Sequence, residues 1–180
     1  MSRSGTRSDW EEFISVLEPH SGERILDIGA GKGEKAAKVL ESSQGIEVFA
    51  VDPDERRVAE AKRDYPAVKS SVAGAEKLPF GDAYFDKAYS TLALHHFANL
   101  DQALSEISRV LKPGGVYVIF EVEPSSLQGR MFRFFGRLMG ERMSIMTEAQ
   151  CIDKLGAADG LEVTRSTRLA GKYLIQLKRQ

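Results

Sequence analysis

The sequence predicts an α/β fold that is doubly wound, with a mostly parallel seven-stranded sheet ending in an antiparallel hairpin and helices on both faces. Short apolar runs alternate with helical patterns along most of the chain, which is typical of βαβ units and a parallel sheet. The run at 116–120 is apolar throughout, as a strand covered on both faces should be. The segments 161–169 and 172–177 are strand-like and separated only by Ala170 and Gly171, so they must pair antiparallel.

The other elements follow from capping signals and apolar spacing. The first helix begins after Ser8, because Ser8 and Glu11 have the spacing of a capping box, and it ends near Pro19. A helix near 100–111 has one apolar face and stops at Lys112-Pro113-Gly114-Gly115, a strong turn signal. In chain order, the remaining elements are predicted as a strand at 25–29, a helix at 33–42, a strand at 46–51, a helix at 54–64, strands at 68–72 and 86–90, and a helix at 147–157.

The composition indicates one domain that spans residues 1–180 and has no nucleic acid as its main partner. A chain of 180 residues with a net charge of −1 has room for one ordinary core and no electrostatic attraction to a polyanion. Its one cysteine, Cys151, excludes an internal disulfide framework and fits a reducing compartment. No apolar run is long enough to span a bilayer, and no apolar segment follows residues 1–7 as it would in a secretory signal. We therefore expect a cytoplasmic protein.

Three glycines, Gly29, Gly31 and Gly33, alternate with other residues between the first strand and the next helix. Glycines allow a sharp turn and leave no side chains above the backbone, so a ligand can lie against the N–H groups of the helix N-terminus. The spacing is not that of a dinucleotide loop, and Glu34 stands where it would repel a pyrophosphate. No Gly-Lys-Ser/Thr closes the run, which excludes a Walker A loop. The sequence therefore predicts a nucleoside ligand without a diphosphate.

Two carboxylates are expected beside this glycine loop. Asp52 ends the second strand about 20 residues after the glycines, where a carboxylate can accept hydrogen bonds from both hydroxyls of a ribose. Asp52 or Asp54 can also cap the helix at 54–64. Asp27, near the end of the first strand, adds a second carboxylate facing the loop. Two negative charges favour a ligand that carries positive charge.

With these features the chain resembles the class I S-adenosylmethionine-dependent methyltransferases, in particular the small-molecule branch related to quinone-biosynthesis enzymes. The resemblance implies a single Rossmann-like methyltransferase domain with S-adenosyl-L-methionine as its cofactor. It rests on motifs that occur in the family's order at 25–33, 51–52, 75–80, 85–86, 94–97 and 111–115.

The resemblance also implies which residues bind the cofactor. Gly74 departs from the family pattern, because members commonly have an acidic residue there that accepts the adenine amino group. Recognition of adenine would then be looser, or come from the backbone and Glu76. By the resemblance, the methionine part is held by Gly29, Gly31 and neighbouring backbone such as Ala30, and its ammonium by Asp27. The ribose is bound by Asp52, the adenine is flanked by Ala75 and Glu76, the pocket near the cofactor is lined by Thr91 and Leu92, and Pro53 belongs to the same cofactor-binding set.

The sequence assigns no catalytic residue, although His95, His96 and Glu121 are candidates. Histidines titrate near neutral pH, and Glu121 is expected just after the fifth strand, at the edge where parallel sheets bind ligands. Methyl transfer to a good nucleophile needs mainly in-line positioning, so hydrogen bonding at a helix start and a solvated loop are the alternative interpretations. No metal site is expected, because adjacent histidines lack the spacing of ligands and His20 is the only other histidine.

The segment 130–139 is basic, aromatic and amphipathic, with Arg130, Arg133 and Arg137. It lies within 123–146, between the fifth strand and the last helix, where an insertion can cover the mouth of a site. Three interpretations follow. The segment is a lid that shapes an apolar acceptor pocket, a surface that rests on a membrane or a protein partner, or a packed helix with solvated arginines.

The sequence thus predicts S-adenosylmethionine-dependent methyl transfer to a small-molecule acceptor. The residues at 90–93 lack the Asn/Asp-Pro-Pro-Tyr/Phe motif of methylases that act on exocyclic amines of DNA. One alternative is a non-catalytic cofactor-binding or partner module with the same fold. Another is an NAD(P)-dependent oxidoreductase, which Glu34 disfavours.

Overall fold

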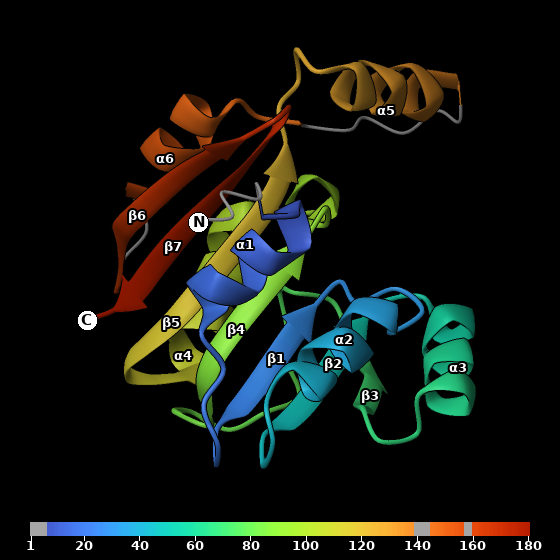
Figure 1. Ribbon diagram of the computed structural model, residues 1–180, viewed down its shortest axis with the longest axis vertical. Helices are drawn as coiled ribbons and strands as arrows, with labels where there is room; N and C mark the ends of the chain where they lie inside the picture. Colours follow the sequence, from blue (N-terminus) through green and yellow to red (C-terminus); the bar gives the residue numbers. More distant parts are fainter. Residues whose placement is uncertain (1–6, 139–144, 157–159) are drawn as a thin grey trace, which may run out of the picture.

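A seven-stranded sheet in the order β3-β2-β1-β4-β5-β7-β6 runs through the molecule (Figure 1). This computed structural model describes residues 7–138, 145–156 and 160–180. Neighbouring strands are parallel from β3 to β5, whereas β7 is antiparallel to both β5 and β6, which confirms the predicted sheet with its terminal hairpin. The strands are β1 (Arg24–Ile28), β2 (Glu47–Asp52), β3 (Lys69–Val72), β4 (Phe85–Thr91), β5 (Leu111–Val122), β6 (Leu161–Leu169) and β7 (Lys172–Arg179).

Helices cover both faces of the sheet, as predicted, because the central strands β1, β2, β4 and β5 contribute apolar side chains to a core on each face. Helices α1 and α2 pack on one face, with Phe13 of α1 against Tyr89 and Phe120 of the sheet. Helices α4 and α6 pack on the other face. The helices are α1 (Asp9–Leu17), α2 (Glu34–Ser42), α3 (Glu55–Asp64), α4 (Leu100–Val110), α5 (Leu127–Leu138) and α6 (Glu148–Gly156), with a short 3₁₀ turn η1 (Leu94–His96).

Two of the expected helix starts are visible as hydrogen bonds. Ser8 caps α1 through a capping box, with Glu11 accepting from the Ser8 N–H at 2.7 Å and the Glu11 N–H donating to Ser8 Oγ at 3.2 Å. Asp54 rather than Asp52 caps α3, because its carboxylate accepts from the N–H groups of Arg56 and Arg57. The carboxylate of Asp52 is thereby left to interact with other groups.

The prediction for the end of the fifth strand was wrong. We expected the strand at 116–120 with Glu121 after it, but β5 begins at Leu111 and continues to Val122. It extends because β7 pairs with it as far as Val122, with Glu121 opposite Tyr173. A solvated loop position for Glu121 is therefore excluded, since its side chain is buried inside the sheet.

The segment between β5 and α6 is partly described. Helix α5 lies beyond the carboxyl end of β5, away from the helices that cover the sheet (Figure 1). Residues 139–144 of the predicted lid at 123–146 lie outside the described residues, as do 1–6 and 157–159 of the predicted domain. Across the described ranges, every helix is too short or too polar to cross a lipid bilayer.

Candidate functional site

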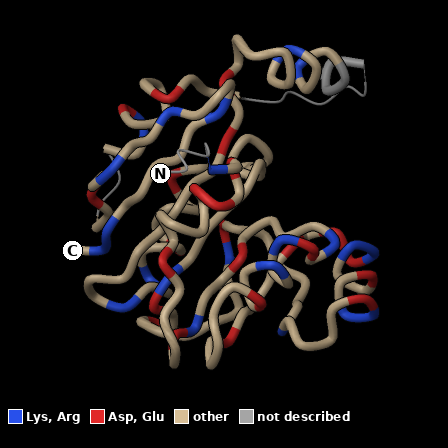
Figure 2. Tube along the Cα trace, viewed as in Figure 1, with Lys and Arg blue, Asp and Glu red and all other residues tan. Residues whose placement is uncertain are grey.

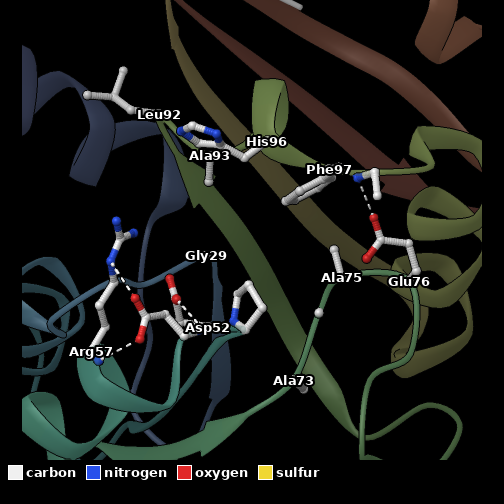
Figure 3. Close-up of a pocket in the computed structure, with 14 residues that line it drawn as sticks. Gly29, Asp52, Arg57, Ala73, Ala75, Glu76, Leu92, Ala93, His96 and Phe97 are labelled. Carbon is white, nitrogen blue, oxygen red and sulfur yellow. Dashed lines mark hydrogen bonds and ion pairs between the residues drawn. The ribbon is translucent and has the colours of Figure 1, made fainter. Parts of the chain in front are cut away.

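A pocket of about 460 Å³ lies at the carboxyl ends of β1, β2 and β4. The strand order reverses between β1 and β4, and open α/β sheets bind ligands at such a point. In Figure 3, Asp52 and Arg57 lie on one side of the pocket, Phe97 and Ala75 on the other. The pocket is lined by Gly29, Asp52, Pro53, Asp54, Arg57, Ala73, Gly74, Ala75, Glu76, Leu92, Ala93, His96, Phe97 and Ala98.

The turn from β1 to α2 passes closely between β2 and β4. The N–H groups of Gly29 and Ala30 both donate to the carbonyl of Val51, at 2.8 and 3.0 Å. Gly29 has φ +78°, and a Cβ there would stand 2.5 Å from the Cβ of Ala93, so only glycine fits. At Gly31 a Cβ would meet no atom within 4 Å, which leaves open space above the backbone. The turn therefore offers a bare main-chain surface at the start of a helix.

The carboxylate of Asp52 is directed at this turn. Its Oδ2 accepts the N–H of Gly31 at 2.8 Å and its Oδ1 accepts the N–H of Asp54 at 3.0 Å. The side chain is buried but lines the pocket, and each carboxylate oxygen can accept a further hydrogen bond. The position at the end of β2 thus combines a fixed orientation with remaining acceptor capacity.

Asp27 is buried in β1 without a hydrogen-bond partner for either oxygen among the described residues. Burial raises the pKa of Asp27 to about 7, the hydroxyl of Tyr89 and the ammonium of Lys35 oppose this shift, and the charge of Asp52 adds to it. Burial also lowers the pKa of Lys35, against the attraction of Asp27 and Glu121. Sequence reasoning missed Lys35, because a lysine in the first turn of a helix usually faces solvent.

Glu76 connects two walls of the pocket. Its Oε1 accepts the N–H groups of Ala98 and Asn99, at 2.7 and 3.1 Å, and so holds the turn that leads into α4 (Figure 3). A Cβ at Gly74 would stand 3.0 Å from Oε2 of Glu76. The absence of a side chain at Gly74 thus leaves room for the Glu76 carboxylate.

The three catalytic candidates lie close together but differ in exposure. Glu121 accepts the N–H of Leu94 at 2.9 Å, and its Oε2 lies 3.1 Å from Nδ1 of His95. His95 and Glu121 are both buried, so this pair holds η1 against the end of β5. His96 is exposed and lines the pocket. His95 and Glu121 therefore make structural hydrogen bonds at the start of η1.

The structure separates His20 from the other two histidines. Nδ1 of His20 lies 3.2 Å from Nζ of Lys87, near the amino end of β4, whereas His95 and His96 follow its carboxyl end. Among the residues that the structure describes, no group of three or more His, Cys, Asp or Glu side chains is arranged to hold a metal ion.

The pocket contains part of the predicted set and several unpredicted residues. Four of the predicted residues are absent from the pocket wall, although each lies in or next to the elements that form the pocket: Asp27, Ala30, Gly31 and Thr91. Sequence reasoning missed Arg57. The signal was available, because Asp54 caps a helix that begins three residues after Asp52, and its first turn therefore lies at the same edge of the sheet. The predicted cofactor residues on the wall are Gly29, Asp52, Pro53, Ala75, Glu76 and Leu92.

Comparison with known proteins gives a family match over the same region. The family model described as a methyltransferase domain matches residues 26–119. The chain is 30% identical over 124 residues to the sterol 4-C-methyltransferase strm-1 of Caenorhabditis elegans, covering 62% of this chain and 37% of that protein. It is 34% identical over 110 residues to the ubiquinone/menaquinone biosynthesis C-methyltransferase UbiE of Rubrivivax gelatinosus, covering 61% and 43%. The matched part thus spans less than half the length of either relative.

Solved structures share the fold over nearly the whole chain. An S-adenosylmethionine-dependent methyltransferase from Mesorhizobium loti superposes with a TM-score of 0.80 at 19% identity, covering 97% of this chain and 99% of that chain. At this identity the match supports the fold alone.

The pKa of Asp27 predicts how stability depends on pH. The folded protein keeps a proton on Asp27 up to about pH 7, whereas the unfolded chain loses this proton near the ordinary pKa of 3.8. The free energy of unfolding therefore falls as the pH rises from one pKa to the other. The Asp27→Asn variant lacks this contribution. From about pH 5 to about pH 8, we expect the wild type to lose roughly 2–3 kcal/mol of unfolding free energy relative to the variant, measured by urea denaturation.

Asp86→Asn is the matched control. Burial alone would raise the pKa of Asp86, but the N–H of Arg24 and the ammonium of Lys112 lower it below its usual value. Asp86 is therefore ionised in both states over this range, and its variant should differ from wild type by a constant amount. An Asp27→Asn variant with the same pH slope as wild type would contradict the assignment.

Proposed function

This chain belongs to the class I S-adenosylmethionine-dependent methyltransferase family, and we propose that it transfers the methyl group of S-adenosylmethionine to a small apolar acceptor. The observation that carries the proposal is the orientation of Asp52. Its carboxylate is held 2.8 Å from the N–H of Gly31, on the wall of the pocket at the strand-order reversal. A carboxylate in that position can accept hydrogen bonds from the two hydroxyls of a ribose lying across the glycine turn.

Features of the described residues fit this cofactor independently of the family. The buried carboxyl group of Asp27, which has no hydrogen-bond partner among the described residues, suits a cationic partner such as the ammonium of an amino acid tail. The open backbone above Gly31 has room for that tail. Across the pocket, Ala73, Ala75 and Phe97 form an apolar wall that suits a planar base.

The residues of this chain contribute position and exclusion of water. When bound, S-adenosylmethionine supplies a methyl group activated by the positive charge on its sulfur. Asp52 and the glycine turn orient the donor, and Glu121 fixes η1 through Leu94 and His95. Transfer then depends on holding the acceptor in line, which contributes most when water is excluded from the site.

We propose that the described part of the lid segment forms one side of the acceptor site. The ring of Phe132 on α5 lies against His95, with centroids 6.3 Å apart. The lid therefore brings an apolar side chain next to the turn that lines the pocket. The names of the two relatives, which act on a sterol and in quinone biosynthesis, support an apolar acceptor.

We further propose a cytoplasmic protein whose main partner is a small molecule. The net charge of −1 favours no polyanion. Cys151 is free and buried, and burial raises the pKa of its thiol to about 12, so it is unreactive and fits a reducing compartment.

Calorimetric titration with S-adenosylmethionine and S-adenosylhomocysteine tests the function directly. We expect saturable binding of both, followed by methyl transfer to members of a panel of quinol, phenol and sterol acceptors. Binding without transfer to any acceptor would instead support a non-catalytic module with the same fold. No binding of either ligand would refute the proposal.

Asp52→Ala should weaken the binding of S-adenosylhomocysteine by more than tenfold, because charge-assisted hydrogen bonds to a ribose contribute roughly 1.5–3 kcal/mol each. The matched control is Asp54→Ala, which removes the cap of α3 beside the same pocket but leaves the carboxylate at the end of β2. Circular dichroism checks that both variants fold. Equal losses of affinity in the two variants would contradict the ribose assignment.

The affinity for S-adenosylhomocysteine should depend on pH through Asp27. Asp27 must lose its proton to bind an ammonium, so cofactor binding releases a proton below about pH 7. We expect binding to be about tenfold weaker at roughly pH 6 than at pH 8. Calorimetry in buffers of different ionisation enthalpy measures the released proton.

Two variants assign this pH dependence to its group. Asp27→Asn should bind weakly at every pH, since it has no carboxyl group to titrate. His96 also lines the pocket and is of a residue type that titrates in this range, so His96→Gln is the control. It should keep the full effect, because we assign the effect to Asp27. An effect lost in His96→Gln and kept in Asp27→Asn would overturn the assignment.

A further inference from the structure

We propose that the outer face of α5 binds the surface of a bilayer containing anionic lipids. Three large apolar side chains on this helix are exposed: Leu127 at 82%, Met131 at 49% and Phe134 at 65%. Their spacing of four and three residues puts them on one face of a helix. Among the described residues, Val72 is the only other large apolar side chain this exposed. The exposed apolar surface is therefore concentrated on α5.

The orientation of α5 is set by its opposite face. A Cβ at Gly129 would stand 2.3 Å from the carbonyl oxygen of Glu123, so the helix packs directly against the preceding backbone there. Phe132, three residues on, faces the body of the protein and contacts His95. The hydroxyl of Ser126 accepts the N–H of Gly129 at 3.0 Å and caps the first turn. With the inner face held in this way, the stripe of Leu127 and Met131 must point outward.

The charge beside the stripe identifies the occupant. The chain from 124 to 140 contains three arginines and no acidic residue, although the whole chain has a net charge of −1. Figure 2 shows blue but no red along the described part of α5. Arg130 is exposed next to the stripe, and Arg133 donates to the carbonyl of Pro124 at 3.0 Å, which holds its positive charge near the helix.

An apolar stripe flanked by arginines suits the boundary between lipid headgroups and acyl chains. The side chains of Leu127 and Met131 would enter the acyl region while the guanidinium groups remain with the phosphates. A second copy of this chain is a poorer occupant, since pairing two such stripes would bring arginines of the same charge together. A nucleic acid would leave the apolar stripe in water.

Flotation of the purified protein with lipid vesicles tests the proposal, and it needs neither cofactor nor acceptor. It is therefore independent of methyl transfer. We expect the wild type to bind vesicles of mixed phosphatidylcholine and phosphatidylglycerol, to bind phosphatidylcholine alone much more weakly, and to lose affinity as salt is added. No binding to the mixed vesicles at low salt, or equal binding to both kinds, would overturn the proposal.

Variants assign the binding to the two parts of the surface. Leu127→Glu with Met131→Glu should reduce partitioning by at least about tenfold. Arg130→Gln should reduce it by about fivefold, since one arginine near an anionic surface contributes on the order of 1 kcal/mol. Arg133 is left in place because of its bond to Pro124. The matched controls are Val72→Glu on the edge strand β3 and Arg56→Gln on α3, both exposed, and neither should change partitioning.

Melting temperatures and the binding of S-adenosylhomocysteine should be unchanged in the α5 variants, which separates loss of docking from loss of folding. Equal losses in the controls and the α5 variants would overturn the proposal. The proposal would also be overturned if the wild type were a dimer and the double variant Leu127→Glu with Met131→Glu were a monomer, because a second copy of the chain would then cover this face.

Discussion

The close passage of the β1–α2 turn between two neighbouring strands is the constraint on which the site depends. On one side the turn has no room for a Cβ at Gly29, because Ala93 lies 2.5 Å from that position. On the other side the N–H of Gly31 is bound by Asp52. Ala93 and Asp52 are both positioned by the parallel pairing of β1 with β4 and β2, in which Asp27 stands opposite Tyr89 and Ala50. The register of β1 with β2 and β4 is therefore what aligns the turn, and a shift of one residue would separate all three.

The two buried carboxylates near this turn, Glu121 and Asp27, differ in their hydrogen bonding. Glu121 is fully engaged, since it accepts the N–H of Leu94 and pairs with His95. Asp27 has no hydrogen-bond partner among the described residues, and burial raises its pKa to about 7. An unpaired buried carboxyl group destabilises the folded chain, and a cationic ligand would restore that free energy on binding. One carboxylate thus supports the architecture, and the other is the group that we propose for a cationic ligand.

Helix α5 has two faces with different surroundings. Gly129 packs against the backbone of Glu123 after β5, and Phe132 contacts His95 of η1, so the inner face is held against the body of the protein. The outer face places Leu127 and Met131 in solvent beside arginine side chains. The inner contact gives α5 a defined position, and the outer surface is exposed. The lid and membrane interpretations of this segment are consequently compatible, because they concern opposite sides of one helix.

The sequence by itself determined most of the helices and strands, the glycine turn and the positions of Gly29 and Asp52, because apolar periodicity, capping residues and glycine conformation act over a few neighbouring residues. It did not determine the bounds of β5 or that 127–138 forms a helix. It did not determine that β4 lies beside β1 or that β7 lies between β5 and β6. That order brought Ala93 and Phe97 into the pocket and buried Glu121 inside β5. Strand order is decided only when distant apolar faces are buried together, so only the tertiary structure completed the site.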